Sequence, residues 1–244
     1  MVEGPGVTVV IATRDRRDEL ARTLGKLTAL PERPPVIVVD NGSRDGTAPM
    51  VRRRYPGVTL IRLRRNRRAA ARTAGARRAA TRYVAFSDDD SWWEPGALTR
   101  ARALLEASPG VGVVAGAVLV GPEGTEDPLN RVLAASPLPR DGLPGPRVLG
   151  FLGCAIVARR DAFLGAGGYR RLLGIGGEEE LLALDLAARG WAAVYAPAVV
   201  ARHHPSPHRD SAARRAAEQR NSVLIAFARR PLRRALAGAA ALAR

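Results

Sequence analysis

The sequence predicts an α/β fold in which a mostly parallel central sheet is flanked by helices. Over roughly the first hundred residues, apolar runs rich in valine and isoleucine alternate with segments of helical periodicity. Such runs are typical of strands buried on both faces, and their alternation with helices implies right-handed crossovers that keep the strands parallel. At 244 residues the chain is long enough to bury this core without disulfide bonds.

The first predicted strand covers residues 7–12 and is followed by a polar turn. Asp18 is expected to cap a helix that runs to about Leu30, because the leucines there recur at helical spacing and Pro31 follows. The same patterns continue further along the chain. They predict strands at 36–39, 58–63 and 83–86, and helices at 47–55, 67–80 and 95–107.

The second half of the chain is less regular. Residues 111–120 predict a further strand, whereas residues 121–147 contain six prolines and predict a long, mobile loop. Gly190 is expected to end a helix at 178–189. The remaining patterns predict strands at 151–157 and 191–195 and a basic helical tail at 206–244, interrupted at Pro231.

The charge balance is strongly basic, with 39 lysines and arginines against 23 acids and a net charge of +16. Such a field attracts nucleic acid, anionic lipid or a nucleoside diphosphate. Codon composition explains it equally well, because Lys26 is the only lysine and the chain is rich in arginine, alanine and glycine. With 5% aromatic residues the chain is poor in stacking platforms, so nucleic acid is not an expected partner.

Cellular location follows from what the sequence lacks. No run approaches the roughly 20 apolar residues of a transmembrane helix, and no basic region opens the chain as in a signal peptide. Cys154 is the only cysteine, which excludes a disulfide framework and a cysteine zinc site. We therefore expect a cytoplasmic protein. The arginines and leucines around Pro231 predict either peripheral contact with the inner face of the membrane or a terminal helix packed on its own domain.

Three adjacent carboxylates, Asp88, Asp89 and Asp90, follow the predicted strand at 83–86. They repel one another, and their position at a strand end is costly unless a cation or hydrogen-bond donors gather there. Oxygen ligands suit Mg²⁺ or Mn²⁺, which commonly bridge protein carboxylates and substrate phosphates. The alternative is an exposed acidic turn before the next helix.

Histidines and further acids occur in two short clusters. All three histidines of the chain, His203, His204 and His208, lie within six residues, and imidazole is a good ligand for Mn²⁺. Two glycines precede Glu178 and Glu179 at a predicted helix start. Repulsion between these acids can leave one poised as a base, although acids in a first turn also simply stabilise the helix dipole. The histidines are equally compatible with a solvated loop.

Arginines gather at the start of the helix predicted at 67–80. Arg67, Arg68 and Arg72 lie where the helix dipole does not favour cations. Arginines at a helix N-terminus form a natural anion site. The alternative is a solvated basic face.

Taken in order along the chain, these motifs resemble the family 2 inverting glycosyltransferases of the GT-A fold. The resemblance is best over residues 7–100 and 150–205. It implies a divalent-metal-dependent transfer of a sugar from a nucleotide-diphosphate sugar to an acceptor hydroxyl, with inversion. The resemblance implies an acceptor that is a glycan, a lipid or a small molecule, without saying which. Residues 1–205 would form the transferase domain, with the nucleotide-binding half at about 1–100 and the acceptor and catalytic half at about 101–205.

The resemblance also implies roles for individual residues. Glu179 matches the position of the catalytic base, with Glu178 beside it, although many relatives carry aspartate there. Leu181 stands where many relatives carry a further aspartate. The substrate-binding residues would be Thr13, Asp40, Arg72, Asp88 and Asp89, and the metal would be held by Asp90 and one of His203 and His204.

Two other classes of protein fit parts of the pattern. A sugar-phosphate nucleotidyltransferase shares a similar sheet, but needs a glycine-rich loop after the first strand, and residues 13–17 contain no glycine. A non-catalytic basic module that binds nucleic acid or membrane would explain the charge. It would not explain why Asp40 and the three aspartates at 88–90 all follow strands.

Overall fold

The structure, a computed structural model, describes residues 6–171, 173, 176–205, 211–229 and 232. His208 and most of the arginine-rich segment around Pro231 lie outside these residues. The predictions made for them are therefore not addressed by the structure.

The predicted α/β fold is confirmed. Strands β1 (Val7–Thr13), β2 (Val36–Asp40), β3 (Thr59–Arg62) and β4 (Tyr83–Ser87) pair in parallel within one sheet, close to the predicted bounds. The spatial order of the sheet is β3-β2-β1-β4-β8-β6-β9-β5, with β7 paired to β6. Because β1, β2 and β4 end at the same edge, the residues that follow them meet there.

Antiparallel pairing enters the sheet in its second half. Strand β8 (Ile156–Arg159) runs antiparallel to β4 and to β6 (Val111–Val120), and β5 (Ser91–Trp93) runs antiparallel to β9 (Ala192–His203). The prediction of a strand at 151–157 was wrong by several residues. Strand β9 is far longer than predicted, because the register shift between Gly116 and Ala117 lets it bulge past Pro197 and continue.

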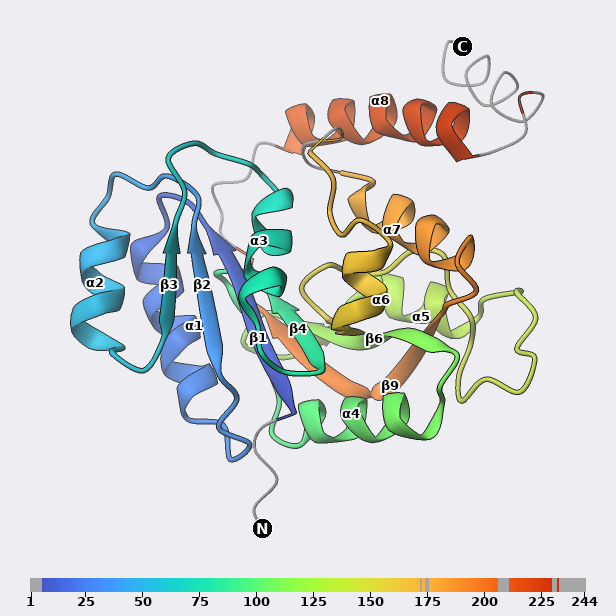
Figure 1. The fold of residues 1–244 in the computed structure, drawn as a ribbon, viewed down its shortest axis with the longest axis horizontal. Coiled ribbons are helices and arrows are strands. Elements are labelled where there is room, and N and C mark those ends of the chain that lie inside the picture. Colours follow the sequence, from blue (N-terminus) through green and yellow to red (C-terminus); the bar gives the residue numbers. More distant parts are fainter. Residues whose placement is uncertain (1–5, 172, 174–175, 206–210, 230–231, 233–244) are drawn as a thin grey trace.

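Helices cover both faces of this sheet (Figure 1). Helices α1 (Arg17–Thr28), α2 (Thr47–Arg54) and α4 (Ala97–Ala107) pack in one apolar core. On the other face, α3 (Ala70–Arg78), α6 (Arg160–Gly165) and α7 (Glu178–Ala187) pack in a second core. Helix α8 (Ser211–Arg229) lies over the end of the molecule that holds α7. None of the helices in the described ranges has the length and apolar character that crossing a membrane requires.

Two local predictions were wrong. Asp18 does not cap α1: it lies in the first turn, where its carboxylate accepts a hydrogen bond from Arg17. Residues 121–147 are not structureless, since they contain β7 (Thr125–Glu126) and α5 (Pro128–Ala134). Proline misled the prediction because Pro128 stands in the first turn of α5, where its fixed φ is favourable. The buried side chain of Asn130 then ties α5 to the sheet through two hydrogen bonds with the backbone of Val118.

Candidate active site

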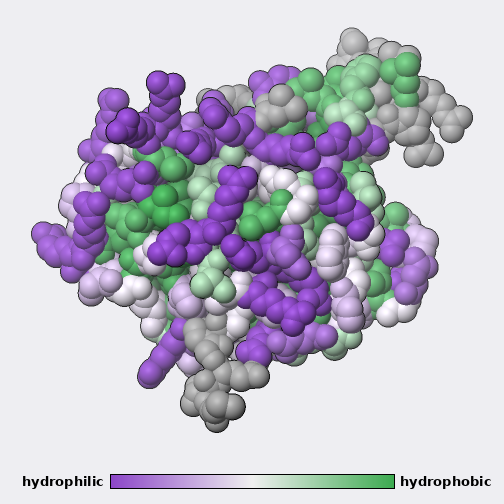
Figure 2. Space-filling model, in the orientation of Figure 1, coloured by the Kyte–Doolittle hydropathy of each residue, from purple (hydrophilic) through white to green (hydrophobic). Residues whose placement is uncertain are grey.

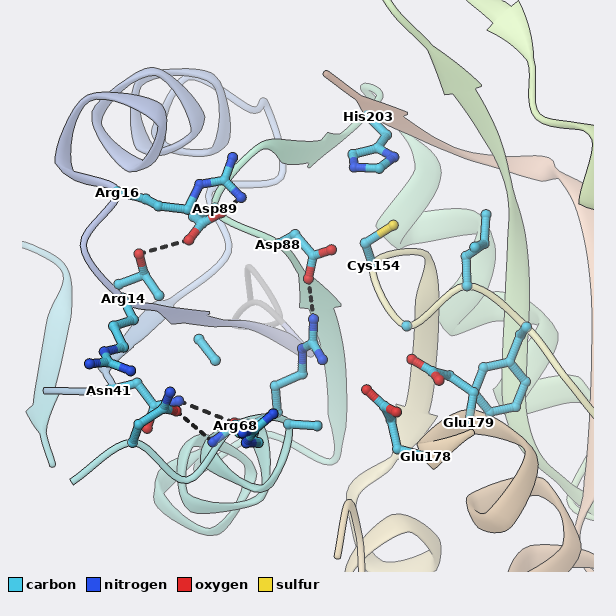
Figure 3. Close-up of a pocket in the computed structure, with 18 of the residues that line it drawn as sticks. Arg14, Arg16, Asn41, Arg68, Asp88, Asp89, Cys154, Glu178, Glu179 and His203 are labelled. Atoms are coloured by element: carbon cyan, nitrogen blue, oxygen red, sulfur yellow. Dashed lines mark hydrogen bonds and ion pairs between the residues drawn. The ribbon is translucent and has the colours of Figure 1, made fainter. Parts of the chain in front are cut away.

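A cavity of about 780 Å³ opens at the carboxyl ends of β1 and β4. One wall comes from these strand ends and from α3, and the opposite wall from residues 151–154 and the start of α7. Figure 3 shows Asp88 on the first wall, with Glu178 and Glu179 across the cavity on the second, whereas the Asp89 carboxylate turns away from these glutamates. Among the residues predicted for the site, the cavity is lined by Thr13, Arg72, Asp88, Asp89, Glu178, Glu179 and His203.

Asp89 and Asp90 are buried and held by an arginine. The Arg16 guanidinium lies 3.1 Å from a carboxylate oxygen of Asp89 and 2.9 Å from one of Asp90. The hydroxyl of Thr13 also donates to Asp89, at 2.9 Å. Burial raises the pKa of Asp89 to about 7, although the charge of Arg16 opposes this. The sequence predicted that the adjacent aspartates 88–90 repel one another, and the positive charge of Arg16 offsets part of this repulsion.

Asp88 points into the cavity and pairs with Arg72. Burial by itself lowers the pKa of Arg72, but the charges of Asp88 and of further acidic neighbours such as Glu179 together outweigh it, and the pKa lies above its ordinary value. The guanidinium also lies 5.6 Å from the ring centre of Tyr169. Arg72 is therefore a fixed cation between the two walls.

Asp88, Asp90 and His203 each present one ligand atom, and these atoms lie within 4.8 Å of one another. Nε2 of His203 is 3.4 Å from a carboxylate oxygen of Asp90. Two carboxylate oxygens and one imidazole nitrogen form a donor set that suits Mn²⁺, so the residues fit the implied metal. His204 lies outside this group, with its ring centre 4.7 Å from that of Trp92.

Glu178 and Glu179 enter the cavity from the first turn of α7. Glu179 packs over Gly153 so closely that a Cβ at residue 153 would collide with its Oε1. Burial, and then the charge of Glu178, raise the pKa of Glu179 to about 8, while Arg72 opposes the shift. A carboxylate with a pKa in this range is suited to accept a proton near neutral pH.

Asp40 does not line the cavity. Its buried carboxylate accepts hydrogen bonds from the backbone of Ser43, at 2.8 Å, and from Arg62, at 3.3 Å. The next residue, Asn41, lines the cavity instead, and its side chain bonds to the backbone of Arg67 and Arg68. Asp40 therefore orders the turn beside the site.

Several lining residues were not predicted. Arg14, Arg16 and Asn41 could have been found from the sequence, since they lie immediately beyond the strand ends that supplied the predicted residues. Cys154 and Ala217 carried no such signal. Arg14 and Arg16, which follow β1, join Arg68 and Arg72 in the lining, and these four cations suit a polyanionic ligand.

Comparison with known proteins decides the family. The family described as Glycosyl transferase family 2 matches residues 8–165. The chain belongs to glycosyltransferase family 2. The match confirms the resemblance seen in the sequence. The protein is therefore an enzyme, a glycosyltransferase of the family 2 type.

Relatives agree with this assignment. The family 2 chain is 29% identical to the N-acetylglucosaminyl-diphospho-decaprenol L-rhamnosyltransferase of Mycobacterium tuberculosis, over 96% of the chain and 90% of that protein.

Solved structures confirm the GT-A fold. The mannosyltransferase PcManGT from Pyrobaculum calidifontis, in complex with GDP-Man and Mn²⁺, superposes with a TM-score of 0.70 at 24% identity, over 90% of this chain and 62% of that one. S. aureus TarS 1–349 in complex with UDP-GlcNAc superposes at 0.68 with 15% identity, over 91% of this chain and 65% of that one. The chain thus spans less than two thirds of either structure.

Proposed function

We propose that this glycosyltransferase transfers a sugar from a nucleotide-diphosphate sugar to a hydroxyl of a lipid-linked acceptor, with inversion. One observation carries the proposal. A group of two aspartates and a histidine, fit for a divalent ion, faces a carboxylate of raised pKa across a single cavity. This arrangement separates the two duties of the reaction, holding the leaving diphosphate and accepting a proton.

The donor lies along the wall formed by the strand ends. Thr13 and the turn that Asp40 orders, with Asn41, receive the nucleoside, and Asp88 lies toward its ribose. Arg14, Arg16, Arg68 and Arg72 surround the diphosphate. The structures in complex with UDP-GlcNAc and GDP-Man support a nucleotide sugar as the donor.

Mn²⁺ or Mg²⁺ is the proposed cofactor, held by Asp88, Asp90 and His203. When bound, it would stabilise the negative charge of the leaving diphosphate. His203 is preferred over His204, because only His203 belongs to the group of ligand atoms. The Mn²⁺ named with the Pyrobaculum mannosyltransferase supports this cofactor.

Glu179 is the proposed base, with Glu178 raising its proton affinity. It takes the proton from the acceptor hydroxyl as that oxygen attacks the anomeric carbon on the face opposite the diphosphate. General-base help of this kind is typically worth ~10²–10⁴-fold. The attack geometry requires base and diphosphate on opposite walls, which is how Glu179 and Asp88 lie in Figure 3.

The acceptor is proposed from the mycobacterial relative, whose name gives a sugar on decaprenyl diphosphate as its acceptor. Helix α8 supports a site at the inner face of the membrane. Its exposed apolar side chains include Leu224 and Phe227, and Figure 2 shows apolar surface along this helix. These side chains would enter the interface beside the lipid.

The variant E179Q tests the proposed base. Glutamine keeps the size and hydrogen bonding but cannot accept the proton, so turnover should fall by ~10²-fold or more while donor affinity is kept. A panel of UDP-, GDP- and dTDP-sugars with Mn²⁺ and a polyprenyl-diphosphate-linked sugar would identify the substrates. Turnover close to that of the unmodified enzyme would contradict the role of Glu179, and loss of donor binding would make it a substrate ligand.

A further inference from the structure

The two candidate catalytic acids start a helix whose leading turn has little support of its own. Gly176 and Gly177 adopt left-handed φ angles of +89° and +82°, and Gly177 is the N-cap of α7. A glycine has no side chain with which to cap the helix. The direction in which Glu178 and Glu179 enter the cavity therefore depends on whatever holds this turn from outside.

That support comes from Asn221 of α8. Its side chain is fully buried, and its Nδ2 donates to the backbone carbonyls of Leu173, at 2.9 Å, and Gly176, at 2.6 Å. Arg220 donates to Oδ1 of Asn221, also at 2.9 Å, which fixes the orientation of the amide. A single side chain thus joins both ends of the segment that leads into α7.

Packing reinforces these hydrogen bonds. Ile225 is buried in a small apolar cluster with Leu173 and Leu181. A Cβ at Gly177 would approach Cδ1 of Ile225 to 2.9 Å, and a Cβ at Gly176 would approach Cγ of Glu218 to 2.6 Å. The two glycines therefore serve two purposes: they allow the left-handed turn and they admit α8 against it.

We infer that Asn221 is a positioning residue for catalysis, because it clamps the carbonyls of Leu173 and Gly176 and so fixes where Glu178 and Glu179 point. The inference rests on the proposed role of Glu179 as base. It places part of the catalytic apparatus in α8, well beyond residues 8–165 that match the family. Misplacing a reacting group by about 1 Å can cost ~10²-fold in rate.

The test compares N221A and N221D with S222A, a control at an exposed position on the same helix. N221D keeps the side-chain volume and removes the donor. Both Asn221 variants should lower kcat by at least about tenfold and leave the donor KM within about twofold, using the nucleotide sugar identified by the panel. Hydrogen exchange over residues 173–180 should accelerate in both, but not in S222A, and the affinity for UDP or GDP with Mn²⁺ should not change.

Unchanged kcat and exchange in both Asn221 variants would overturn the inference. So would a parallel loss of nucleotide affinity and thermal stability, since that would show a general structural role. If the unmodified enzyme turns over no nucleotide sugar, the proposed function fails. The exchange of residues 173–180 in N221A and S222A then still decides whether Asn221 holds the turn.

Discussion

The two walls of the cavity are built in different ways. The strand-end wall comes from parallel strands that pair directly in the sheet, and its acids are braced by ion pairs with Arg16 and Arg72. The α7 wall rests on a glycine turn that a helix from the far end of the chain clamps. The first wall is therefore fixed by the sheet, whereas the second depends on remote packing. Donor binding and proton transfer should be separable by mutation.

The largest effect expected on the strand-end wall comes from D90A. Losing this carboxylate should weaken Mn²⁺-dependent binding of UDP or GDP by about 100-fold without unfolding the protein, because a repulsive charge is removed and Arg16 keeps Asp89 as partner. Isothermal titration with and without Mn²⁺ measures this, and circular dichroism reports the fold. The same nucleotide affinity in D90A and the unmodified protein would count against the metal group.

A matched substitution on the opposite wall is G153A. The added Cβ would collide with Oε1 of Glu179, so the carboxylate must move, and kcat should fall by about 10–100-fold with nucleotide affinity unchanged. G150A is the control, because no atom lies within 4 Å of a Cβ at that position. Equal turnover in the two variants would show that the position of Glu179 is not critical.

The pH dependence sharpens the comparison further. The base works when deprotonated, and a pKa of about 8 for Glu179 leaves it mostly protonated at pH 7. The value of kcat/KM should therefore rise by about tenfold between pH 7 and pH 9, and this rise should be absent in E179Q. A profile that falls over this interval would assign the titration to an acid instead of a base.

The smallest effect concerns the outer surface of α8. Replacing Leu224 and Phe227 by serine should lower the affinity for phosphatidylglycerol vesicles by about fivefold, or ~1 kcal/mol. The effect is small because about half of each side chain is already covered by the protein, so only the exposed part can be buried in the lipid. V132S is the control, as Val132 is exposed elsewhere on the molecule. If the unmodified protein does not bind the vesicles at low salt, the proposed membrane contact is wrong.

The sequence was most informative where local patterns decide structure. Buried β-branched runs placed β1, β2 and β4, and the polar residues after them located one wall of the cavity. The prolines of 121–147 misled the prediction of a loop, because Pro128 starts a helix, and the continuation of β9 past a bulge at Pro197 was not predicted. Neither outcome can be read from proline content alone.

Contacts between distant segments were beyond prediction. The ion pairs of Arg16 with Asp89 and Asp90 span more than 70 residues, and nothing local indicates that Arg16 will face them. The same holds for Asn221, which contacts residues 45 and 48 positions earlier. Such contacts depend on how completed elements pack against one another.

The register of β5 with β9 has a consequence for biosynthesis. Ser91 pairs with His203, which brings the histidine of the proposed metal group beside aspartates that are made more than a hundred residues earlier. A shift of one residue would turn His203 to the other face of the strand. A ribosome-bound chain that ends before β9 would hold both aspartates but lack the imidazole. Full affinity for the cation should thus appear only when the last strand of the sheet has paired, and bound Mn²⁺ would then stabilise only the finished fold.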